Sequence, residues 1–415
     1  MKKVSKISAL IAVVLLLVGL TGCGEKPAKT QTPTPTPTPT QDPVANISTV
    51  DGLASFLNGT TDATNGKLTA DITTYLSDSF VIPEGKTRVL DLNGYTLTKD
   101  ACFYVRGNLT IKDSSSGKTG KITDTDAWYA FDVPAGGSFT LESGTLEATG
   151  SSTKLIQGKG GDITIKGGVV KAKGCPIYIG NGINGINTGN GLNLIIQDGE
   201  IRSDESDAVK TDNNPRPVNV KITGGRFYSA TRAINLHGDG TAEITGGVFT
   251  GPVGIFVDTN YTVTKIEGVT INASLNGIQN YGGTIKEIVS GTVIASGNSI
   301  TAIHNDNNGT IENIKGGTFK AESSTNNAYG LRNVTGSTTV SGGNFSGTYS
   351  GSSSTYSGYG LYNYSNGTLT VNGGSFNGGS EGHGANYNAG TLNLSSSLSA
   401  NSVFTPALTS SGTIN

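Results

Sequence analysis

The sequence predicts an all-β protein that winds as a right-handed parallel β-helix, a solenoid of about twelve coils with a short capping helix at its N-terminal end. An apolar residue is followed five positions later by another, across Gly or Gly-Gly, at eleven places, and an insertion stretches a twelfth pair. The first members recur every 19 to 31 residues, a spacing typical of solenoids. The chain is also rich in Thr, Ile, Val, Asn, Ser and Gly, as short strands and turns require. The pairs are Leu92/Leu97, Leu141/Leu146, Ile165/Val170, Ile196/Ile201, Ile222/Phe227, Ile244/Phe249, Ile266/Ile271, Ile288/Val293, Ile314/Phe319, Val340/Phe345, Val371/Phe376 and the stretched Ile111/Ile122.

The five-residue interval predicts a corner between two strands of each coil. In one flat strand, residues five apart face opposite sides, yet both members here are apolar. The Gly between them must therefore turn or bulge the chain so that both side chains point inward. An antiparallel sandwich would also use Gly-rich turns, but it does not account for the constant interval. Parallel crossovers are almost always right-handed, which gives the predicted hand.

Residues 1–22 have the pattern of a bacterial export signal. Lysines precede an apolar run, 7–20, that is too short to span a bilayer. The run ends in Leu20-Thr21-Gly22-Cys23, which resembles the lipobox of bacterial lipoproteins. The resemblance implies that Cys23 is lipidated and that the chain is held at the extracellular face of the cell membrane. The alternative is an ordinary cleaved signal with an incidental Cys.

Residues 23–44 are expected to form a spacer between that anchor and the folded part. Thr and Pro alternate through 30–40. Such a segment favours extended polyproline II and cannot build a core.

A capping region, 45–80, is expected before the coils. Asp51–Leu57 is the convincing helix after the signal, because Val50, Leu53 and Leu57 share one face. It would cover the open end of the solenoid. The coils are expected over 81–400, with a cap or tail at 401–415.

The two cysteines of the folded part are expected to stay unpaired. Cys102 and Cys175 would lie three coils apart, or about 14 Å along the axis at about 4.8 Å per coil. A disulfide needs Cα atoms closer than about 7 Å.

A family resemblance begins with the first coils. Its residues are Ile82-Pro83-Glu84-Gly85-Lys86-Thr87-Arg88-Val89-Leu90-Asp91-Leu92-Asn93-Gly94-Tyr95-Thr96-Leu97, followed by Leu109-Thr110-Ile111-Lys112-Asp113. This stretch resembles the opening coils of right-handed parallel β-helix domains in bacterial surface proteins, which belong to the pectate-lyase-like superfamily. The resemblance covers about 45–400 and implies the fold, while its motifs carry no catalytic signature.

A second recurring strand begins at Ala233 and reads small–apolar–variable–Asn. Its Asn residues are expected to stack at a turn, each side-chain amide bonding the amide one coil away. The segments are Ala233-Ile234-Asn235, Gly277-Ile278-Gln279-Asn280, Ala302-Ile303-His304-Asn305, Gly330-Leu331-Arg332-Asn333, Gly360-Leu361-Tyr362-Asn363 and Gly384-Ala385-Asn386-Tyr387-Asn388.

Three long neighbouring loops, Gly174–Asn190, Ser203–Pro217 and Ser229–Gly240, are expected to form one wall or groove, because function in a solenoid lies on its loops and one exposed face. The acidic and basic residues of the last two resemble in kind those of parallel β-helix polysaccharide lyases. That resemblance implies Ca²⁺ ligands at Asp204, Asp207 and Asp212 and a base at Lys210 or Arg232.

Several features favour a role without catalysis for these loops. The lyase run Arg-x-Pro-x-x-Arg is missing, and Arg216-Pro217 is a fragment of it. A solvated polar loop explains the charges equally. His304 and His383 are expected to be exposed turn residues without a ligand cluster, so no cofactor is required, and Ca²⁺ is implied only by the lyase interpretation.

The C-terminal third is nearly uncharged after Lys320 and holds seven of the 15 tyrosines. Tyr359, Tyr362, Tyr364 and Tyr387 are the ligand-contact candidates, with Tyr362 and Tyr387 one coil apart. Tyrosine suits sugar stacking or protein contact. Stacking of tyrosines across strands, to shield the backbone, is the alternative.

These observations favour a membrane-anchored surface protein that binds carbohydrate or another surface without catalysis. A uronate polysaccharide lyase and a structural spacer are the alternatives. The net charge is −2 with interspersed signs, which predicts no nucleic-acid partner.

Overall fold

The chain divides into two units, 1–41 and 42–415. The computed structural model describes residues 42–75, 80–125, 129–149, 154–180, 192–212, 217–379 and 384–415, all in the second unit. The predicted signal peptide, Cys23, most of the spacer, Arg216 and His383 lie outside the described residues.

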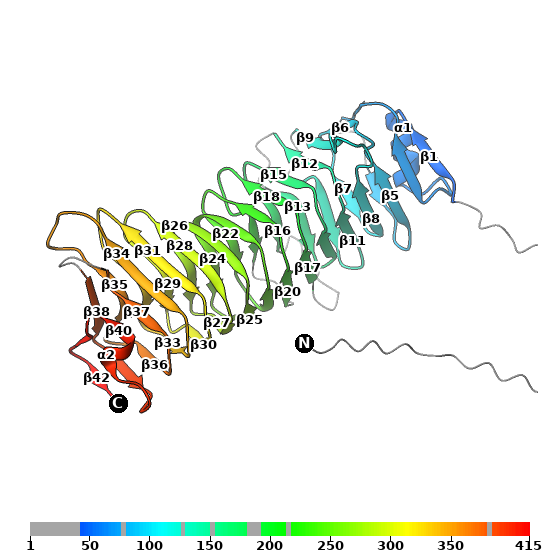
Figure 1. Cartoon of the computed structure of the whole chain (residues 1–415). Coiled ribbons are helices and arrows are strands. Elements are labelled where there is room, and N and C mark those ends of the chain that lie inside the picture. The colour runs from blue at the N-terminus through cyan, green and yellow to red at the C-terminus, as the bar shows by residue number, and fades with distance from the viewer. Residues whose placement is uncertain are drawn as a thin grey trace, which may run out of the picture. The chain divides into compact units, whose positions relative to one another are not determined.

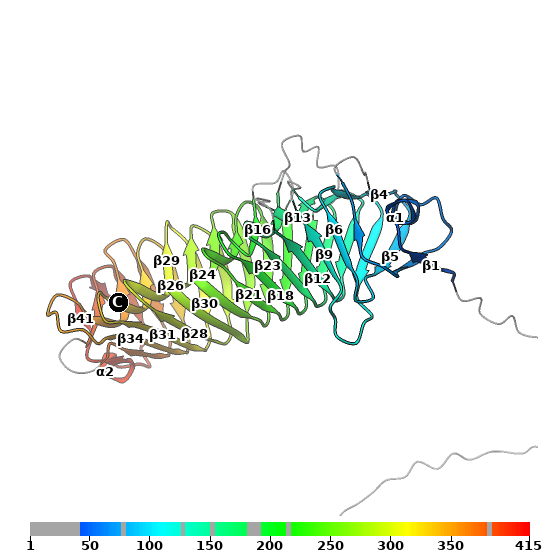
Figure 2. The ribbon, with the colours of Figure 1, turned by 90° about the horizontal axis from the view of Figure 1, so that it is seen from above.

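The second unit is a parallel β-solenoid of about 14 turns, which confirms the predicted parallel β-helix. Each full turn contributes one strand to each of three sheets that run along the solenoid. Strands of successive turns pair in parallel throughout. Figures 1 and 2 show the turns following one another along a single axis, with α1 (Val50–Leu57) at the first turns and β42 at the last.

The first sheet has 16 strands in sequence order. They are β1 (Val44–Ile47), β2 (Asn65–Leu68), β5 (Thr87–Asp91), β8 (Asn108–Lys112), β11 (Ser138–Leu141), β14 (Asp162–Ile165), β17 (Leu192–Ile196), β20 (Val218–Ile222), β23 (Gly240–Ile244), β25 (Tyr261–Ile266), β27 (Thr284–Ile288), β30 (Thr310–Ile314), β33 (Ser337–Val340), β36 (Thr368–Val371), β39 (Thr391–Leu394) and β42 (Thr413–Ile414).

The other 26 strands form two sheets that share the long strands β24 (Val248–Asp258) and β26 (Val269–Tyr281). The rest of the second sheet is β3 (Ile72–Thr73), β6 (Thr96–Lys99), β9 (Lys121–Asp124), β12 (Thr145–Ala148), β15 (Val169–Ala172), β18 (Glu200–Ser203), β21 (Arg226–Tyr228), β28 (Gly291–Ser296), β31 (Thr318–Ser323), β34 (Asn344–Tyr349), β37 (Ser375–Asn377) and β40 (Phe404–Thr405). The rest of the third sheet is β4 (Phe80–Ile82), β7 (Phe103–Val105), β10 (Phe131–Pro134), β13 (Lys154–Lys159), β16 (Cys175–Ile179), β19 (Val209–Thr211), β22 (Arg232–Leu236), β29 (Ile300–Asp306), β32 (Ala328–Asn333), β35 (Gly358–Asn363), β38 (Gly384–Asn388) and β41 (Thr409–Ser410).

The five-residue interval is the corner between the first and second sheets. Both members of every pair are at most 1% exposed, as predicted. The Gly between them turns the chain with a positive φ, for example 96° at Gly225 and 100° at Gly343. A side chain is strained in that region of φ, which explains why Gly recurs there.

The prediction of about twelve coils was slightly low because the terminal coils lack the interval. In the first coil the buried Leu68 and Ile72 are four positions apart instead of five, and they continue the columns of Leu92 and Leu97. In the last, α2 (Ala400–Val403) is inserted before Phe404, which stacks on Phe376 at 5.2 Å. Strands therefore pair outside the range 81–400, from Val44 to Ile414.

The helix α1 forms where the sequence predicts it, at the first turns of the solenoid. The hydroxyl of Thr49 accepts a hydrogen bond of 3.1 Å from the backbone N–H of Gly52, which caps the helix. Leu53, Phe56 and Leu57 are fully buried in the same core cluster as the coils.

The predicted ladder of Asn side chains is present along the third sheet from β26 to β38. Each Nδ2 donates to the Oδ1 of the next Asn at 2.7–3.0 Å, and each member is fully buried. The members are Asn280, Asn305, Asn333, Asn363 and Asn388. Each member is thus hydrogen-bonded to an amide of a neighbouring coil, while the Oδ1 of Asn280, the first member, has no partner among the described residues.

Asn235 was wrongly assigned to this ladder. In β22 and β24 the column that contains Asn280 is occupied by Leu236 and Val257. Asn235 lies one position earlier and pairs with Phe256. Its Nδ2 donates instead to Asp207 Oδ2 at 2.7 Å.

Cys102 and Cys175 are both unpaired, as predicted. They lie three coils apart in the register of β7, β10, β13 and β16. Burial raises the pKa of each thiol to about 12, so both stay protonated at neutral pH.

Candidate functional site

The outer face of the third sheet carries both groups of candidate residues. Strand pairing places Tyr178, Lys210, Asn235, Phe256, Gln279, His304, Arg332, Tyr362 and Tyr387 in one column, one residue per coil. The inward neighbours of this column, such as Ile177, Ile234 and Leu361, are fully buried. Lys210 of the predicted charged residues and Tyr362 and Tyr387 of the predicted tyrosines therefore lie along one continuous surface.

The first stretch, which we call the charged cluster, consists of Tyr178, Lys210, Asp212, His237 and Asp258. The hydroxyl of Tyr178 donates to Asp212 Oδ2 at 2.6 Å, and Lys210 Nζ lies 3.7 Å from the same oxygen. His237 Nε2 is 3.7 Å from Asp212 Oδ1, and its Nδ1 is in hydrogen-bond contact with Asp258. The side chains are between 19% and 35% exposed where they form ion pairs, so the network is open to solvent.

Desolvation raises the pKa of Tyr178, and the hydrogen bond to Asp212 raises it further. The phenol is therefore a proton donor in this network at neutral pH.

Asp207 lies beside the charged cluster but is committed to holding the fold. It accepts hydrogen bonds from the backbone N–H of Arg232 at 3.1 Å, from Asn235 Nδ2 at 2.7 Å and from the Thr231 hydroxyl. Arg232 Nη1 lies 3.9 Å from its Oδ1, and the Arg232 guanidinium packs 4.4 Å from the centre of the Phe256 ring. With 6% exposure, Asp207 has little surface for an external ligand.

The third predicted acidic residue, Asp204, points elsewhere. It follows β18 of the second sheet and pairs with Arg202 Nε at 2.8 Å, where both side chains are more than half exposed. Within the described ranges, no group of three His, Cys, Asp or Glu residues lies close enough to hold a metal ion. Asp204, Asp207 and Asp212 are thus not brought together, whereas Lys210 and Asp212 are.

The second stretch, which we call the tyrosine cluster, consists of Tyr329, Tyr359, Tyr362, Tyr364 and Tyr387 around Arg332. Tyr329 and Tyr359 stack at 5.1 Å and 11°, while Tyr362 contacts Tyr364 at 4.5 Å and Tyr387 at 5.0 Å between ring centroids. Tyr362 and Tyr387 are one coil apart, as predicted. All except Tyr329 are half-buried, so they present ring surface to solvent.

Arg332 lies among these rings. Its guanidinium carbon is 5.2 Å from the centroid of Tyr329 and 5.1 Å from that of Tyr364. Its Nη2 donates to the Tyr364 hydroxyl at 3.1 Å. Sequence reasoning missed Arg332 and Tyr329, although the variable position of the Asn strands and the count of nearby tyrosines were available as signals.

His304 was wrongly predicted to be an exposed turn residue. It lies in β29, in the outward column directly beside Arg332, and its side chain is 12% exposed. Burial, reinforced by Arg332, lowers the pKa of His304 to about 4.

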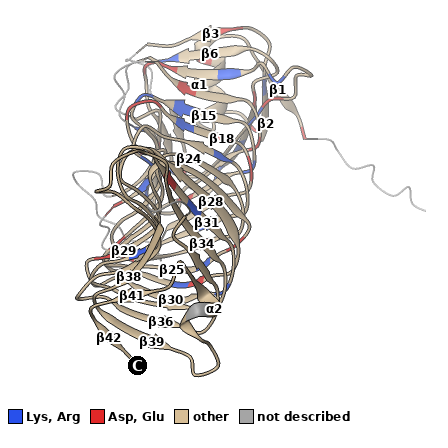
Figure 3. Cartoon of the chain, turned by 60° about the vertical axis from the view of Figure 1, so that its left-hand side comes forward, with Lys and Arg blue, Asp and Glu red and all other residues tan. Residues whose placement is uncertain are grey.

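The charged side chains lie mainly on the earlier turns. Figure 3 shows blue and red segments there, whereas the last turns, around β36–β42, are almost entirely tan. In the sequence, only Glu322, Arg332 and Glu381 are charged after Lys320. The two clusters therefore differ in chemistry although they share a sheet.

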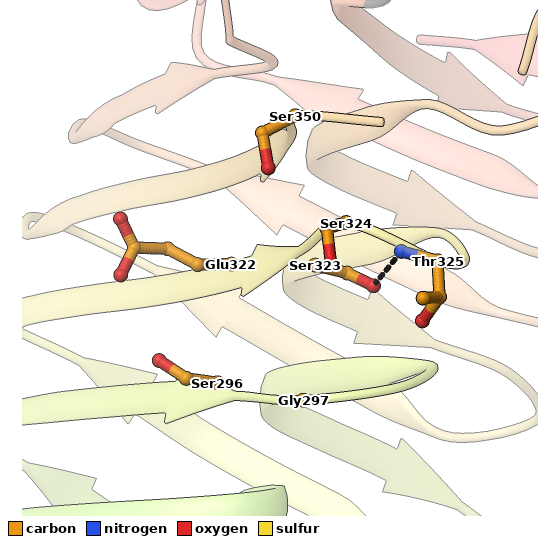
Figure 4. A pocket seen from close by; sticks show the side chains of 7 residues that line it. All are labelled: Ser296, Gly297, Glu322, Ser323, Ser324, Thr325 and Ser350. Carbon is orange, nitrogen blue, oxygen red and sulfur yellow. Dashed lines mark hydrogen bonds between the residues drawn. The ribbon is translucent and has the colours of Figure 1, made fainter. Parts of the chain in front are cut away.

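A hollow of about 490 Å³, lined by residues of neither cluster, lies at turns that follow strands of the second sheet (Figure 4). Ser296, Ser323, Thr325 and Ser350 line it, and Ser323 Oγ accepts a hydrogen bond from the backbone N–H of Thr325 at 3.3 Å. Its one carboxylate, Glu322, pairs with Lys320 at 2.6 Å. The hollow brings hydroxyl groups together without an acid–base pair.

The chain matches no protein-family model, no curated protein and no solved structure. Among the described residues, no helix has the length and apolar character needed to cross a bilayer.

Proposed function

We propose that this protein is a lipid-anchored cell-surface protein that binds carbohydrate through the outer face of its third sheet, without catalysis. The observation that supports the proposal most directly is the tyrosine cluster, in which half-buried rings from successive coils surround one arginine. The predicted lipid at Cys23 and the Thr/Pro spacer would hold this face outside the cell.

Tyrosine rings suit a sugar ligand because they combine an apolar face with a hydroxyl that can donate or accept a hydrogen bond. Their side-chain conformations are restricted by mutual packing, so little entropy is lost on binding. Coils repeat at about 4.8 Å, so a linear polymer along the axis would meet equivalent positions repeatedly.

A glycan array tests this proposal with a chain that starts at Asp42 and keeps every described residue. We expect binding to a polysaccharide, and Tyr362→Ala should weaken it about tenfold, since truncation of a central aromatic contact typically costs more than 1 kcal/mol. Tyr75→Ala is the matched control, because Tyr75 is 68% exposed near the first turns, far from the tyrosine cluster. An array without a single bound glycan would contradict the proposal and leave the structural-spacer interpretation.

A second candidate function, uronate lyase activity, is favoured by the charged cluster. Lys210, Tyr178 and His237 all lie within 3.7 Å of Asp212, which gives proton donors and acceptors at one point of an open face. Incubation with pectate or alginate should release unsaturated uronate if this candidate is right. Lys210→Met should abolish that release, while Lys171→Met, on the second sheet, should not.

A further inference from the structure

Lys99 and Asp124 form a fully buried pair between neighbouring coils. They lie at the ends of β6 and β9 and are direct partners in the parallel register of the second sheet. Both side chains are 0% exposed, and Lys99 Nζ lies 3.2 Å from Asp124 Oδ1. Neither residue belongs to the outer face of the third sheet, so the proposed binding function does not explain them.

The surroundings of Lys99 are apolar on two sides. Its Nζ lies 5.2 Å from the centroid of Phe103 and 5.7 Å from that of Phe131, and it also donates to the carbonyl of Ala101. Removing a full ion pair from water costs several kcal/mol per charge, which favours transfer of the proton from the ammonium to the carboxylate. Burial accordingly lowers the pKa of the Lys99 amine, with the charge of Asp124 opposing the shift.

Proton transfer would leave a neutral amine against a neutral carboxylic acid, which are the two reactants of an amide. The amine lies 3.2 Å from Oδ1 of Asp124, which is bonded to the carbon atom that would be attacked, so the amine adjoins the carboxyl group with which it would react. Asp100, the next residue, acts electrostatically on the same amine and has a buried Oδ1 with no hydrogen-bond partner among the described residues. Its negative charge, like that of Asp124, opposes the lowering of the Lys99 pKa.

We propose that Lys99 and Asp124 become joined by an intramolecular amide bond that cross-links neighbouring coils. Lys99 Nζ forms a bond to Asp124 Cγ, the C–OH bond of the acid breaks, and the amine proton leaves with that hydroxyl as water. The ammonium and carboxylate already contain all the atoms and protons required, so no oxidant or activating group is needed.

The cross-link would lie near the end of the solenoid that follows the predicted anchor. A force applied through the N-terminal segment would first act on the early coils, since each coil contacts only its neighbours. A covalent bond between the strands of Lys99 and Asp124 would stop the separation of coils at that point. This role is independent of any ligand.

Lys159 and Asp132 form a second Lys–Asp ion pair between coils, which differs from the first in its exposure to solvent. Lys159 Nζ is closer to its carboxylate, at 2.9 Å, but the two side chains are 21% and 11% exposed. Water can solvate these charges, and hydrogen bonds to Asp132 and to Tyr129 favour the charged amine. We expect this pair to remain an ion pair.

Mass spectrometry of the full-length protein tests the proposal. Tryptic digestion under denaturing conditions should give one branched species in which the peptide 89–106, uncut at Lys99, is joined to the peptide 122–154, with a mass one water below their sum. Fragmentation should place the link at Lys99 and Asp124. The peptide ending at Lys159 should appear separately and at its unmodified mass.

Lys99→Arg is the matched variant, because Arg keeps the charge but lacks the nucleophilic amine. It should yield the peptide 122–154 alone, whether or not the variant is less stable. Recovery of separate peptides 89–99 and 122–154 from the wild-type protein, at unmodified masses, would refute the cross-link and leave a buried ion pair. The mass readout does not depend on carbohydrate binding, so the two proposals can fail separately.

Discussion

The middle and the C-terminal stretches of the third sheet place polar and apolar side chains in opposite ways. In the middle, Leu236 and Val257 fill the inner column, while Lys210 and Tyr178 on the outer column join a network of charges. From β26 onward Asn residues fill the same inner column, and Tyr residues dominate the outer one towards the C-terminus. One backbone pattern therefore supports two different surfaces and two different interiors.

A repeated coil can bury a polar side chain where the next coil supplies its hydrogen-bond partner. An isolated buried amide would cost a few kcal/mol, but each ladder Asn meets an identical group one coil away. Outer columns do not enter the core, so they can change from charged to aromatic without altering the winding.

The largest expected effect comes from the core that both stretches share. Phe345 stacks between Phe319 and Phe376 at 4.9 and 4.8 Å and is 1% exposed. Phe345→Ala should lower the free energy of unfolding by about 3–5 kcal/mol, measured by urea denaturation followed by circular dichroism. Ser346→Ala, on the outward side of the same strand, should change it by less than about 0.5 kcal/mol. Equal effects of the two variants would contradict the assigned faces of β34.

The Asn ladder should give the next largest effect. Asn333→Ala removes the donor to the buried Asn363 Oδ1 and one of several acceptors of Asn305 Nδ2, so the Asn363 oxygen is left without that hydrogen bond. We expect a loss of about 3 kcal/mol in the free energy of unfolding. The exposed Asn344 of the neighbouring second sheet is the control, and Asn344→Ala should be nearly neutral. If Asn333→Ala left the free energy of unfolding unchanged, the Asn ladder would add no more stability to the C-terminal interior than apolar residues add to the middle one.

The pH dependence of stability should distinguish the C-terminal stretch through His304. Its pKa in the folded protein is about 4, below the ordinary value of 6.5, because burial disfavours its charged form and Arg332 repels it. The unfolded chain therefore binds more protons between these values, so stability falls as the pH falls from about 6.5 to about 4. The loss should approach about 3 kcal/mol at most.

His304→Gln removes this contribution, because glutamine does not titrate in this range. Urea unfolding at pH 7 and pH 4.5 should then show a smaller difference for the variant than for the wild-type protein. If the free energy of unfolding changed equally with pH in both proteins, His304 would not be a source of the pH dependence.

The smallest changes in the free energy of unfolding are expected for the ion pairs of the middle stretch, where a buried and an exposed pair can be compared. Arg232→Ala removes packing on Phe256 and a charge beside the buried Asp207, and should cost about 1–2 kcal/mol in the free energy of unfolding. Arg202→Ala breaks the exposed pair with Asp204 and should cost less than about 1 kcal/mol. Thermal unfolding of both variants measures the difference, and a larger loss from Arg202→Ala would reverse our ranking.

Much of this architecture could be predicted because a solenoid repeats its constraints. Each pair such as Ile222/Phe227 independently indicates the same corner, and the Gly between them marks the turn. The terminal coils were missed because Leu68/Ile72 and Leu394/Phe404 have different spacings. Register was harder to predict. Ala233-Ile234-Asn235 lacks the variable residue of the small–apolar–variable–Asn pattern, so Asn235 lies one residue before the position that the ladder occupies. A shift of one residue moves a side chain to the other face of the strand.

The candidate site was predictable in part. The tyrosines were identified from composition, and Lys210 from the resemblance of its loop to those of β-helix lyases. Tyr178 and Asp258 were missed because their partners lie on other coils, 34 and 21 residues away in the chain. Asp204 and Asp207 precede β19, whereas Asp212 follows it. Asp204 pairs with Arg202 of the second sheet, and Asp207 accepts a hydrogen bond from the backbone N–H of Arg232 at the start of β22.

The repeat, the corner at each glycine and the unpaired state of Cys102 and Cys175 follow from the amino-acid sequence alone, because they depend on local spacing and on the distance between coils. The tertiary structure decided which side chains meet across coils. It placed the charged and tyrosine clusters on one face, buried His304 beside Arg332 and brought Lys99 to Asp124. These contacts depend on register, which the hydrophobic pattern of whole strands and the turns between them set rather than any short motif.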